Sequence, residues 1–406
     1  MSKLHLLILA GVSAAITGSA SYAGPPTGVT IKDLGVGPGG TYSFPIGINN
    51  RGQIVGYGDG GTGSGGLLWT NGIAFSLAFP YPTDTWLELI GFNDDGQIVG
   101  GSAFNGDFNF DPTVPVPHPV LWQQNNVQVL ALAPGAIGGI AFAINEKGII
   151  AGSAADAGLP NIIGHAAVWN RGVPTDLGTL PGDNRAVGKA INDKGDIAGY
   201  STNQTTSRYA ALWSKGKVTK LGPLPGGTYS EAFAINKSRQ VIGDGDAPDG
   251  NSHAILWSGG KTIDLGTLPG GTYSVPGPKF GIGPILNDAG QAVGWGDVAN
   301  GDTHAILWDN GKTIDLGTLP GGTNSKAEGI NQNGQVVGYS NSASGHYHAI
   351  LWNCGKMIDL GTLPGGYDSF GDAINDAGQI AADGDGAGFV GGDHTLLITG
   401  FAQKCK

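Results

Sequence analysis

A phrase of twenty-two residues recurs almost unchanged along this chain, and no other feature limits the possible folds so strongly. It reads HAILWSGGKTIDLGTLPGGTYS at 253–274, HAILWDNGKTIDLGTLPGGTNS at 304–325 and HAILWNCGKMIDLGTLPGGYDS at 348–369. Self-similarity at a fixed period is typical of architectures that copy one structural unit. The chain is therefore expected to be a repeat protein, although its 406 residues would otherwise suggest two or three domains.

The length of the repeat follows from a shorter motif, in which an apolar residue precedes Asn, two variable residues, Gly and Gln or a near match. The motif places one Asn in each unit: Asn49, Asn93, Asn145, Asn192, Asn236, Asn287, Asn331 and Asn375. Their spacings of 44, 52, 47, 44, 51, 44 and 44 residues define eight units of one length class with a few insertions.

Each unit contains four short apolar runs, for example around 232–236, 240–244, 253–257 and 261–266. The runs are rich in Ile, Val, Leu and Trp and are separated by Gly, Asn, Asp, Ser and Pro, which are strand and turn signals. Four strands per unit, repeated eight times, predict an all-β fold, a β-propeller of eight four-stranded blades. A parallel β-helix with two coils per unit is the main competing fold.

The two ends of the chain favour the propeller. The segment VTIKDLG at 29–35 is a lone fourth strand, whereas the last unit stops after its third strand, HTLLIT at 394–399. In a ring, the N-terminal strand would complete the C-terminal blade and leave no open seam. Residues 24–406 are therefore expected to form one propeller domain of eight repeats of about 44–52 residues.

Residues that recur once per unit are interpreted as structural. A Trp occupies one position in seven units, with Ile398 in the eighth, and is expected to pack between neighbouring blades. The repeated Asn and the Pro-Gly-Gly of TLPGG are assigned to turns. Six units carry a His at the start of the third strand, too far from the axis to converge on one metal or substrate: His118, His165, His253, His304, His348 and His394.

The repeated phrases resemble the bacterial extracellular repeats of the HAF family, named after a His-Ala-Phe tripeptide that stands here as His253-Ala254-Ile255. The likeness spans essentially the whole chain after its N-terminal segment. It departs from the pattern in unit one, which reads GLLW without His, and in unit two, where SLAFPYPTD at 76–84 replaces DLGTLPGGT. The resemblance implies secretion and a repeat fold, and it implies no particular reaction or ligand.

The N-terminus indicates export. Residues 1–23 carry Lys3, an apolar run and a terminal Ser21-Tyr22-Ala23, which together predict a secretory signal peptide. No membrane span is expected after its cleavage, so the protein should be secreted or periplasmic in a bacterium, and a monomer is expected. Without Lys3, 20 basic and 32 acidic residues leave a formal charge of −12, which argues against nucleic acid as a partner.

Only two cysteines occur, Cys354 and Cys405. An exported protein meets oxidising conditions, so the two are expected to form a disulfide, with two unpaired thiols as the alternative. The bridge would tie the C-terminus to the seventh unit.

Length variation separates the two faces of the expected propeller. The connections between strands one and two and between strands three and four keep their lengths, whereas insertions fall in the other two connections, such as VPGPKFGIGP at 275–284. In an up-and-down blade these two variable connections emerge on one face. A binding site is expected there, because loops on a rigid scaffold usually carry binding residues; neutral loop drift is the alternative.

Unit two supplies the richest candidate site on that face. Its segments PYPTDTW at 80–86 and FNGDFNFDP at 104–112 combine aromatic rings with carboxylates, an arrangement that stacks on sugars or grips a peptide. Burial of some rings under the long loop is an equal alternative. The candidate ligand-binding residues are Tyr81, Trp86, Phe104, Asp107, Phe108, Phe110 and Asp111.

A weaker candidate is a calcium site in GDGDAPDG at 243–250, formed by Asp244, Asp246 and Asp249. Closely spaced Asp and Gly suit calcium, which needs several oxygens at one point. The spacing is not that of an EF-hand, and DGDGAGFVGGD at 383–393 echoes the segment. No other cofactor is expected.

No catalytic motif stands out: the sequence has no Gly-x-Ser-x-Gly elbow, no His-Glu-x-x-His, no Cys-x-x-Cys and no phosphate loop. We therefore expect a non-enzymatic binding or scaffold protein that recognises a carbohydrate or protein ligand through its variable face. The alternative is an extracellular carbohydrate-active enzyme, a glycosidase or lyase, that uses acidic residues on that face. A structural envelope protein is the third possibility.

Overall fold

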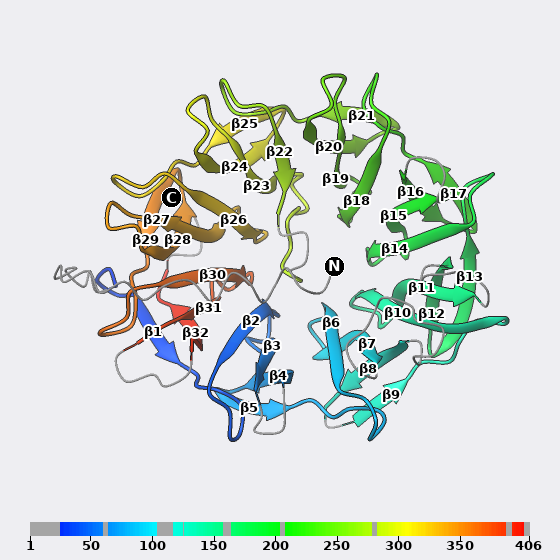
Figure 1. The fold of residues 1–406 in the computed structure, drawn as a ribbon, viewed down its shortest axis with the longest axis horizontal. Helices are drawn as coiled ribbons and strands as arrows, with labels where there is room; N and C mark the ends of the chain where they lie inside the picture. Colours follow the sequence, from blue (N-terminus) through cyan, green and yellow to red (C-terminus); the bar gives the residue numbers. More distant parts are fainter. Residues whose placement is uncertain are drawn as a thin grey trace.

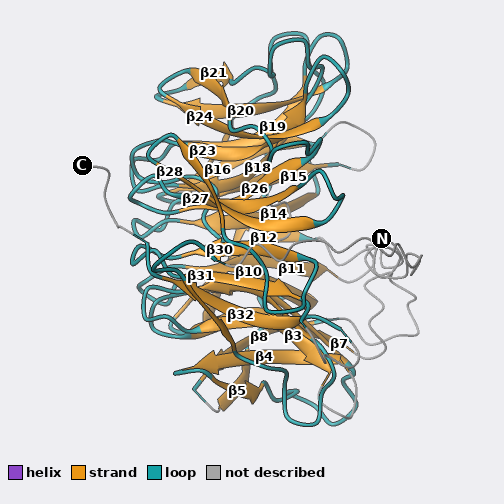
Figure 2. Cartoon of the chain, turned by 90° about the vertical axis from the view of Figure 1, so that its left-hand side faces the viewer, coloured by secondary structure: helices purple, strands orange, loops and turns teal. Residues whose placement is uncertain are grey.

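The computed structural model describes residues 25–59, 64–103, 117–124, 126–156, 164–203, 208–277, 282–386 and 392–401. These residues form 32 β-strands and no helix. The strands make eight antiparallel four-stranded sheets that stand around one axis like the blades of a propeller (Figure 1). In side view all blades lie in one thick disc, with loops at both faces (Figure 2). The predicted eight-bladed β-propeller is confirmed.

Blades 1 to 4 each use four consecutive strands, with the innermost strand first in sequence. Their strands are β2 (Ser43–Ile48), β3 (Ile54–Asp59), β4 (Ser64–Thr70) and β5 (Ile73–Ser76); β6 (Trp86–Phe92), β7 (Gln97–Ala103), β8 (His118–Gln123) and β9 (Asn126–Val129); β10 (Ala136–Ile144), β11 (Ile150–Asp156), β12 (His165–Asn170) and β13 (Val173–Gly178); β14 (Arg185–Ile191), β15 (Ile197–Thr202), β16 (Tyr209–Ser214) and β17 (Lys217–Lys220).

Blades 5 to 7 repeat this order, and blade 8 takes its outermost strand from the other end of the chain. Their strands are β18 (Ser230–Ile235), β19 (Val241–Asp246), β20 (Ser252–Ser258) and β21 (Lys261–Asp264); β22 (Ser274–Pro276), β23 (Ala292–Asp297), β24 (Thr303–Asp309) and β25 (Lys312–Asp315); β26 (Ser325–Ile330), β27 (Val336–Asn341), β28 (Tyr347–Asn353) and β29 (Lys356–Asp359); β30 (Ser369–Ile374), β31 (Ile380–Gly384), β32 (His394–Thr399) and β1 (Thr30–Asp33).

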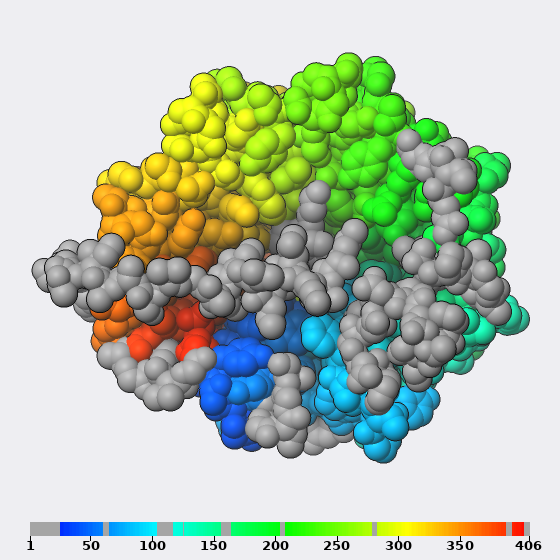
Figure 3. Space-filling model, viewed as in Figure 1, coloured from blue at the N-terminus to red at the C-terminus, as the bar shows by residue number. Residues whose placement is uncertain are grey.

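The ring closes at β1 and β32, which run antiparallel with Thr30 opposite Thr399 and Asp33 opposite Leu396. The space-filling view shows the blades following one another round the ring in chain order, so that the blue and red ends meet in blade 8 (Figure 3). The N-terminal strand thus supplies the missing edge of the C-terminal blade, as the sequence predicts. This pairing covers a sheet edge that would otherwise be open to association with another chain.

The repeated Trp residues pack between blades. Trp69, Trp122, Trp169, Trp213, Trp257, Trp308 and Trp352 are all at most 5% exposed, and Ile398 fills the same position in blade 8. In five blades the indole Nε1 donates a hydrogen bond to a carbonyl of the preceding blade, as Trp122 does to Ala78 at 2.8 Å. The large aromatic therefore both fills the space between blades and ties them together.

The repeated Asn does more than make a turn. Its Oδ1 accepts the backbone N–H four residues later in its own turn, and its Nδ2 donates to the backbone carbonyl of the matching Asn in the next blade, at 2.9–3.2 Å. The last of these bonds runs from Asn375 to the carbonyl of Asn49 and closes the circle. Eight inter-blade hydrogen bonds around one face explain why Asn is present in every unit.

The repeated His is paired with the Asp of the DLG phrase. His165, His253, His304 and His348 each place Nδ1 within 2.8–3.0 Å of the Asp on the adjacent fourth strand. At the seam, His394 pairs with Asp33 at 3.1 Å. Because each pair joins two strands of one sheet, the His residues act within single blades.

The described residues contain no helix with the length and apolar character that crossing a bilayer requires.

Candidate active site

Seven of the eight innermost strands carry a β-bulge at the same place, and the bulge residue differs from blade to blade. A bulge redirects a side chain out of the regular alternation and is common beside functional sites. The bulge residues are Ile46, Ile90, Phe142, Lys189, Phe233, Glu328 and Asp372. Four are apolar and one is a lysine. Only blades 7 and 8 present a carboxylate there.

A second position also differs from blade to blade. It lies on the second strand of the blade, directly opposite the residue that precedes the bulge residue by two places. In blade 8 this position is Asp383 on β31, opposite Phe370. In blade 5 it is Asp244, opposite Glu231, and in blade 7 it is Tyr339, opposite Lys326. The inner ends of blades 7 and 8 thus bring Glu328, Asp372 and Asp383 into one region.

Three carboxyl groups of blade 8 are joined in series. The side chain of Asp372 is hydrogen-bonded to that of Asp383, which is also hydrogen-bonded to the side chain of Asp393, just before β32. Two carboxylates accept but do not donate hydrogen bonds, so each of these links requires a proton on one partner. The Oδ2 atom of Asp372 is fully enclosed and has no hydrogen-bond partner within the part of the chain that the structure describes.

The surroundings of these groups favour their neutral forms. Burial raises the pKa of Asp383 to about 7, and the charge of Asp393 adds to the effect. Burial also raises the pKa of Asp372 well above its usual range, reinforced by the charges of Asp383 and Glu328. For Glu328, burial raises the pKa to about 7 although Lys326 acts in the opposite direction. Burial raises the pKa of Asp393 as well.

Aromatic rings form the wall of this region. Phe370 packs edge-on against Tyr339 with a centroid distance of 5.1 Å and lies 5.5 Å from the ring of Tyr347. Burial raises the pKa of Tyr339, and the charges of Glu328, Asp372 and Asp383 add to the effect. All three rings keep part of their surface accessible.

The end of an insertion that the sequence singles out lies against the inner strands of blades 1 and 7. It follows the short strand β22 of blade 6, and its Ile282 N–H donates to the carbonyl of Ile46 at 3.3 Å. The carbonyl of Pro284 accepts from Ile330 N–H at 2.8 Å. A Cβ at Gly283 would lie 3.7 Å from the carbonyl oxygen of Asp372. The segment therefore lies against the two strands that carry the bulge carboxylates.

In blade 5, the carboxylates at the inner end of the blade are paired with cations or accept hydrogen bonds. Glu231, only 4% exposed, forms ion pairs with Lys189 and Arg208. Burial alone would raise the pKa of Glu231, but these two cations outweigh it, and the pKa lies below its usual value. Asp244 accepts hydrogen bonds from Tyr229 Oη at 2.5 Å and Ser252 Oγ at 3.3 Å. This group is a satisfied structural network.

The aromatic and acidic candidates of unit two are only partly within the described residues. Tyr81 and Trp86 are 41% and 42% exposed, so neither ring is buried. Tyr81 packs edge-on against His118 at 5.1 Å. The remaining candidates, Phe104, Asp107, Phe108, Phe110 and Asp111, lie outside the described residues, so the site stays a prediction.

The candidate calcium ligands are engaged separately. Asp244 is bound by Tyr229 and Ser252, Asp246 accepts from Thr228 and from the backbone of Tyr229, and Asp249 accepts from Asn251. The described residues include no group of three or more His, Cys, Asp or Glu side chains placed to share a metal ion. The predicted calcium site therefore has no support in these contacts.

Cys354 lies in the turn between β28 and β29, where its φ of 56° is in the left-handed region. Cys405 lies outside the described residues. The predicted Cys354–Cys405 bridge stays a prediction.

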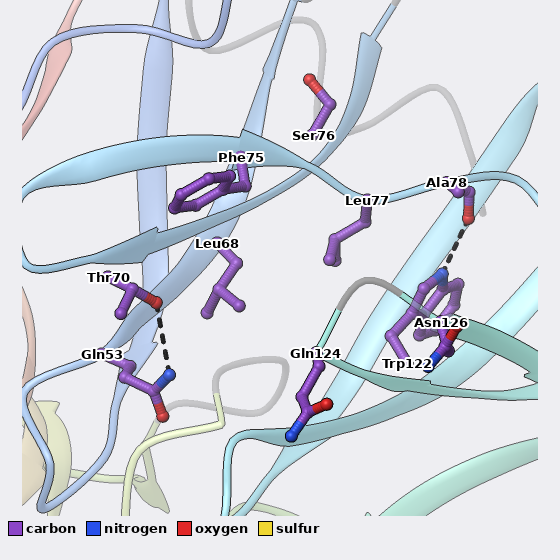
Figure 4. A pocket seen from close by; sticks show the side chains of 10 residues that line it. All are labelled: Gln53, Leu68, Thr70, Phe75, Ser76, Leu77, Ala78, Trp122, Gln124 and Asn126. Carbon is purple, nitrogen blue, oxygen red and sulfur yellow. Dashed lines mark hydrogen bonds between the residues drawn. The ribbon is translucent and has the colours of Figure 1, made fainter.

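A cleft of about 480 Å³ lies between blades 1 and 2, where unit two departs from the repeat (Figure 4). Its polar lining is neutral and includes Gln53, Thr70, Gln124 and Asn126, while Phe75 and Leu77 supply apolar surface. Gln53 donates to Thr70 Oγ1 at 3.2 Å on the blade 1 side of the cleft. Since no lining residue is an acid or a base, this cleft provides no group for proton transfer, and blades 7 and 8 hold the stronger candidate.

Comparisons with known proteins support the fold. No family model and no curated protein matches the sequence. Among solved structures, a prolyl endopeptidase matches with a TM-score of 0.53 and 11% identity over 81% of this chain and 50% of that chain. A puromycin hydrolase mutant matches with a TM-score of 0.50 and 12% identity over 86% of this chain and 60% of that chain. A puromycin-hydrolysing peptidase of Mycobacterium tuberculosis has a TM-score of 0.49 and 12% identity, over 84% of this chain and 56% of that chain.

These matches correct one prediction. At such low identity they show the fold alone, and the chain spans only about half to three fifths of the length of the structures it matches. The prolyl endopeptidase and the puromycin hydrolase are nevertheless hydrolases. The prediction of a non-enzymatic binding or scaffold protein is contradicted by this finding and is wrong: the absence of a catalytic motif in the sequence does not argue against an enzyme whose acid and base are scattered carboxyls.

Proposed function

We propose that this protein is a hydrolase whose acid and base are the linked carboxyl groups of Asp372 and Asp383. The observation that carries the proposal is their hydrogen-bonded pairing in a region where the neighbouring charges, Glu328 and Asp393, are also acidic. Two adjacent carboxyls in such surroundings cannot both ionise easily, so one keeps a proton near neutral pH while the other is able to accept one.

This pair suits the addition of water to an ester, amide or glycosidic bond. The ionised carboxyl accepts a proton from water as the water oxygen bonds to the electrophilic carbon, and the protonated carboxyl donates its proton to the leaving oxygen or nitrogen. The two carboxyls thereby exchange roles. Asp393, linked to Asp383 and nearer the loop face, provides a route by which protons return to their starting positions.

Two further observations support a hydrolase. Two of the structures that share the propeller fold, each with a TM-score of 0.50 or above, are a prolyl endopeptidase and a puromycin hydrolase. The insertion at Ile282–Pro284 lies against the strands of Glu328 and Asp372 and helps to hold them in place beside the carboxyls. General acid–base catalysis requires groups that are held in position.

The expected cellular setting is part of the same proposal. A signal peptide at residues 1–23, secretion or periplasmic location, membership of the HAF family and a bridge between Cys354 and Cys405 are all consistent with an enzyme that acts outside the cytoplasm. Each remains a prediction from sequence.

The test is a hydrolysis assay of the purified protein against chromogenic peptide anilides, carboxylic esters and glycosides. Asp383→Asn and Asp372→Asn should each lower kcat by about 100-fold or more, the usual contribution of a general acid or base. Asp244→Asn is the matched control, because Asp244 occupies the position of Asp383 in blade 5 but belongs to a satisfied network. It should leave kcat unchanged.

The same assay also tests the pH dependence. Because one carboxyl must be ionised and the other protonated, kcat should follow a bell-shaped curve in wild-type protein. Absence of hydrolysis across the panel, or full activity of the Asp383→Asn protein, would refute the proposal.

A further inference from the structure

The region between blades 7 and 8 has a large excess of negative groups. It combines Glu328 on β26 with Asp372 on β30 and Asp383 on β31, and Asp393 adjoins them before β32. Asp368 and Asp385 act on Asp393 from the loop side. Two cationic side chains act on this set: Lys326, opposite Tyr339, and His394, which is paired with Asp33.

Lys326 does not neutralise this set. Its Nζ lies over the ring of Trp295 in blade 6, 4.7 Å from the centroid. In blade 5, by contrast, Lys189 and Arg208 form ion pairs with the buried Glu231. Within the part of the chain that the structure describes, Glu328, Asp372 and Asp383 form no such ion pair, although Asp368 beside the site pairs with His346.

A group of acids alone does not identify a ligand site, but here an enclosed oxygen gives an independent indication. Asp372 Oδ2 has no hydrogen-bond partner among the described residues and no exposed surface. A buried oxygen without a partner costs free energy, and native proteins rarely retain one without a use. A hydrogen-bond donor on a ligand would satisfy it.

The aromatic wall points to the same kind of ligand. Tyr339, Tyr347 and Phe370 pack against one another beside the carboxyls, and Asp383 lies directly across the strand pair from Phe370. The faces of aromatic rings attract cations, most strongly where water is excluded. Carboxylates and aromatic faces together are the chemistry that recognises an ammonium or guanidinium group.

We propose that the site between blades 7 and 8 selects substrates that carry a positively charged ammonium or guanidinium group close to the bond that is cleaved. This inference names the substrate class and rests on the proposed hydrolase. Glu328 and the aromatic rings of Tyr339 and Phe370 hold the cation, and the Asp372–Asp383 pair remains the acid and base. Glu328 is thus a specificity-determining residue.

Binding of a cation at this site should release protons. The folded-state pKa of Glu328, the carboxyl that holds the cation, is about 7, so Glu328 is largely protonated at pH 6 and must ionise to pair with a cation. The affinity for a cation should therefore rise with pH until Glu328 is ionised. The titratable groups that face the site are Lys326, Glu328, Tyr339, Tyr347, Asp368, Asp372, Asp383, Asp385, Asp393, His394 and His346, which is paired with Asp368 at 3.3 Å.

The experiment is isothermal titration calorimetry of the full protein with benzylamine, with benzyl alcohol as the neutral match and benzoate as the anionic one. Benzylamine should bind about tenfold more tightly at pH 8 than at pH 5, as expected when carboxyls must lose a proton to pair with it. At pH 6 its binding enthalpy should vary with the ionisation enthalpy of the buffer, which reports proton release. The alcohol and benzoate should bind at least about tenfold more weakly.

Glu328→Gln should weaken benzylamine binding by about tenfold, the effect of one charged hydrogen bond. Glu88→Gln is the matched control, since Glu88 is a half-buried glutamate on the innermost strand of blade 2, and its replacement should leave the affinity unchanged. Should the Glu328 variant fail to fold, proton release from the wild-type protein still decides the matter. Equal affinity for the alcohol, or benzylamine binding without proton release at pH 6, would overturn the inference.

The outcomes also separate this inference from the proposed function. Benzylamine binding with proton release but no hydrolysis of any substrate would support the cation site and refute the hydrolase. Hydrolysis that depends on Asp383 but prefers neutral to cationic substrates would support the hydrolase and refute the cation site.

Discussion

Blades 5 and 8 place an aspartate at the same position of the second strand, Asp244 in one and Asp383 in the other, yet the two carboxyls have opposite surroundings. Asp244 accepts hydrogen bonds from Tyr229 and Ser252, and Glu231 beside it is held by Lys189 and Arg208. Asp383 instead shares its hydrogen bonds with two other aspartates.

The difference shows that one repeated blade can hold a structural network while another blade of the same fold carries reactive groups. Blade 5 shows that the inner end of a blade tolerates buried carboxylates when each receives donors or cations, which is the ordinary condition for stability. Blade 8 has an aspartate at the same backbone position, but within the described residues no cation pairs with Asp372 or Asp383. Uncompensated buried acids are costly, and titratable groups with strongly shifted pKa values cluster at functional sites. The contrast is therefore the main support for placing the chemistry between blades 7 and 8.

The largest effect should come from breaking the blade 5 network. Glu231→Gln leaves Lys189 and Arg208 without their carboxylate and should lower the free energy of unfolding by about 3 kcal/mol at pH 7. Glu328→Gln, a change of the same kind on the innermost strand of blade 7, removes a group that is unfavourable when ionised and should leave stability unchanged or improve it. Urea denaturation of both variants measures this, and equal losses would erase the distinction between the two regions.

The next effect concerns pH. A carboxyl whose folded pKa is raised binds its proton more tightly in the folded state, so the stability it contributes is lost as the pH rises. For Asp383, whose pKa moves from 3.8 to about 7, the loss occurs between these values. The unfolding free energy of wild-type protein should therefore fall by about 2 kcal/mol more than that of Asp383→Asn between pH 5 and 8. Parallel pH profiles for the two proteins would contradict this.

The third prediction probes how Asp244 is satisfied. Tyr229→Phe removes the hydroxyl that donates to Asp244 at 2.5 Å and should lower stability by about 1.5 kcal/mol. Ser252→Ala removes the longer bond of 3.3 Å and should cost less. Thermal unfolding at pH 7 ranks the two variants. The opposite order would show that Asp244 does not depend on the tyrosine, and it would weaken the description of blade 5 as a matched network.

The smallest effect belongs to the His–Asp pairs, which the two halves of the ring share. His253→Gln in blade 5 and His348→Gln in blade 7 should each cost less than about 1 kcal/mol, because the pairs are partly exposed. The hydrogen bond that His348 donates to Asp359 raises the pKa of His348, so its contribution is present below about pH 6.5 and is lost as the pH rises through the folded value. Denaturation at pH 6 and pH 9 measures both, and a cost above 2 kcal/mol in one blade only would mean that the blades differ at the rim as well.

The fold could be predicted from sequence because every blade repeats the same solution. The Asn motif gave the number of units, and the complementary ends at 29–35 and 394–399 indicated closure. The Asn side chain was assigned only to its turn, although Asn375 and its equivalents also bind the next blade. In the other seven cases that bond joins atoms about one repeat apart in sequence, and its partner is always a backbone carbonyl, so no residue type signals it.

The candidate site could not be predicted in the same way. The pattern at 383–393 indicates only an echo of a calcium-like run, and no sequence motif includes Glu328 or Asp372. A signal did exist: at the position of Asp372, four other blades carry Ile or Phe. Its importance depends on the bulge that turns these side chains inward and on the missing cations, and both are properties of the assembled ring.

The central claim is that the Asp372–Asp383 pair holds a proton at neutral pH, and carbon-13 NMR titration of aspartate carboxyls in the purified protein measures this directly. Asp383→Asn and Asp372→Asn assign the signals. We expect at least one carboxyl of the pair to titrate near pH 7. Glu231, observed through labelled glutamate, should have a pKa below the ordinary value of a glutamate. Titration of both aspartates near pH 4 would show that blade 8 is as well compensated as blade 5, and the proposed acid and base would have to be abandoned.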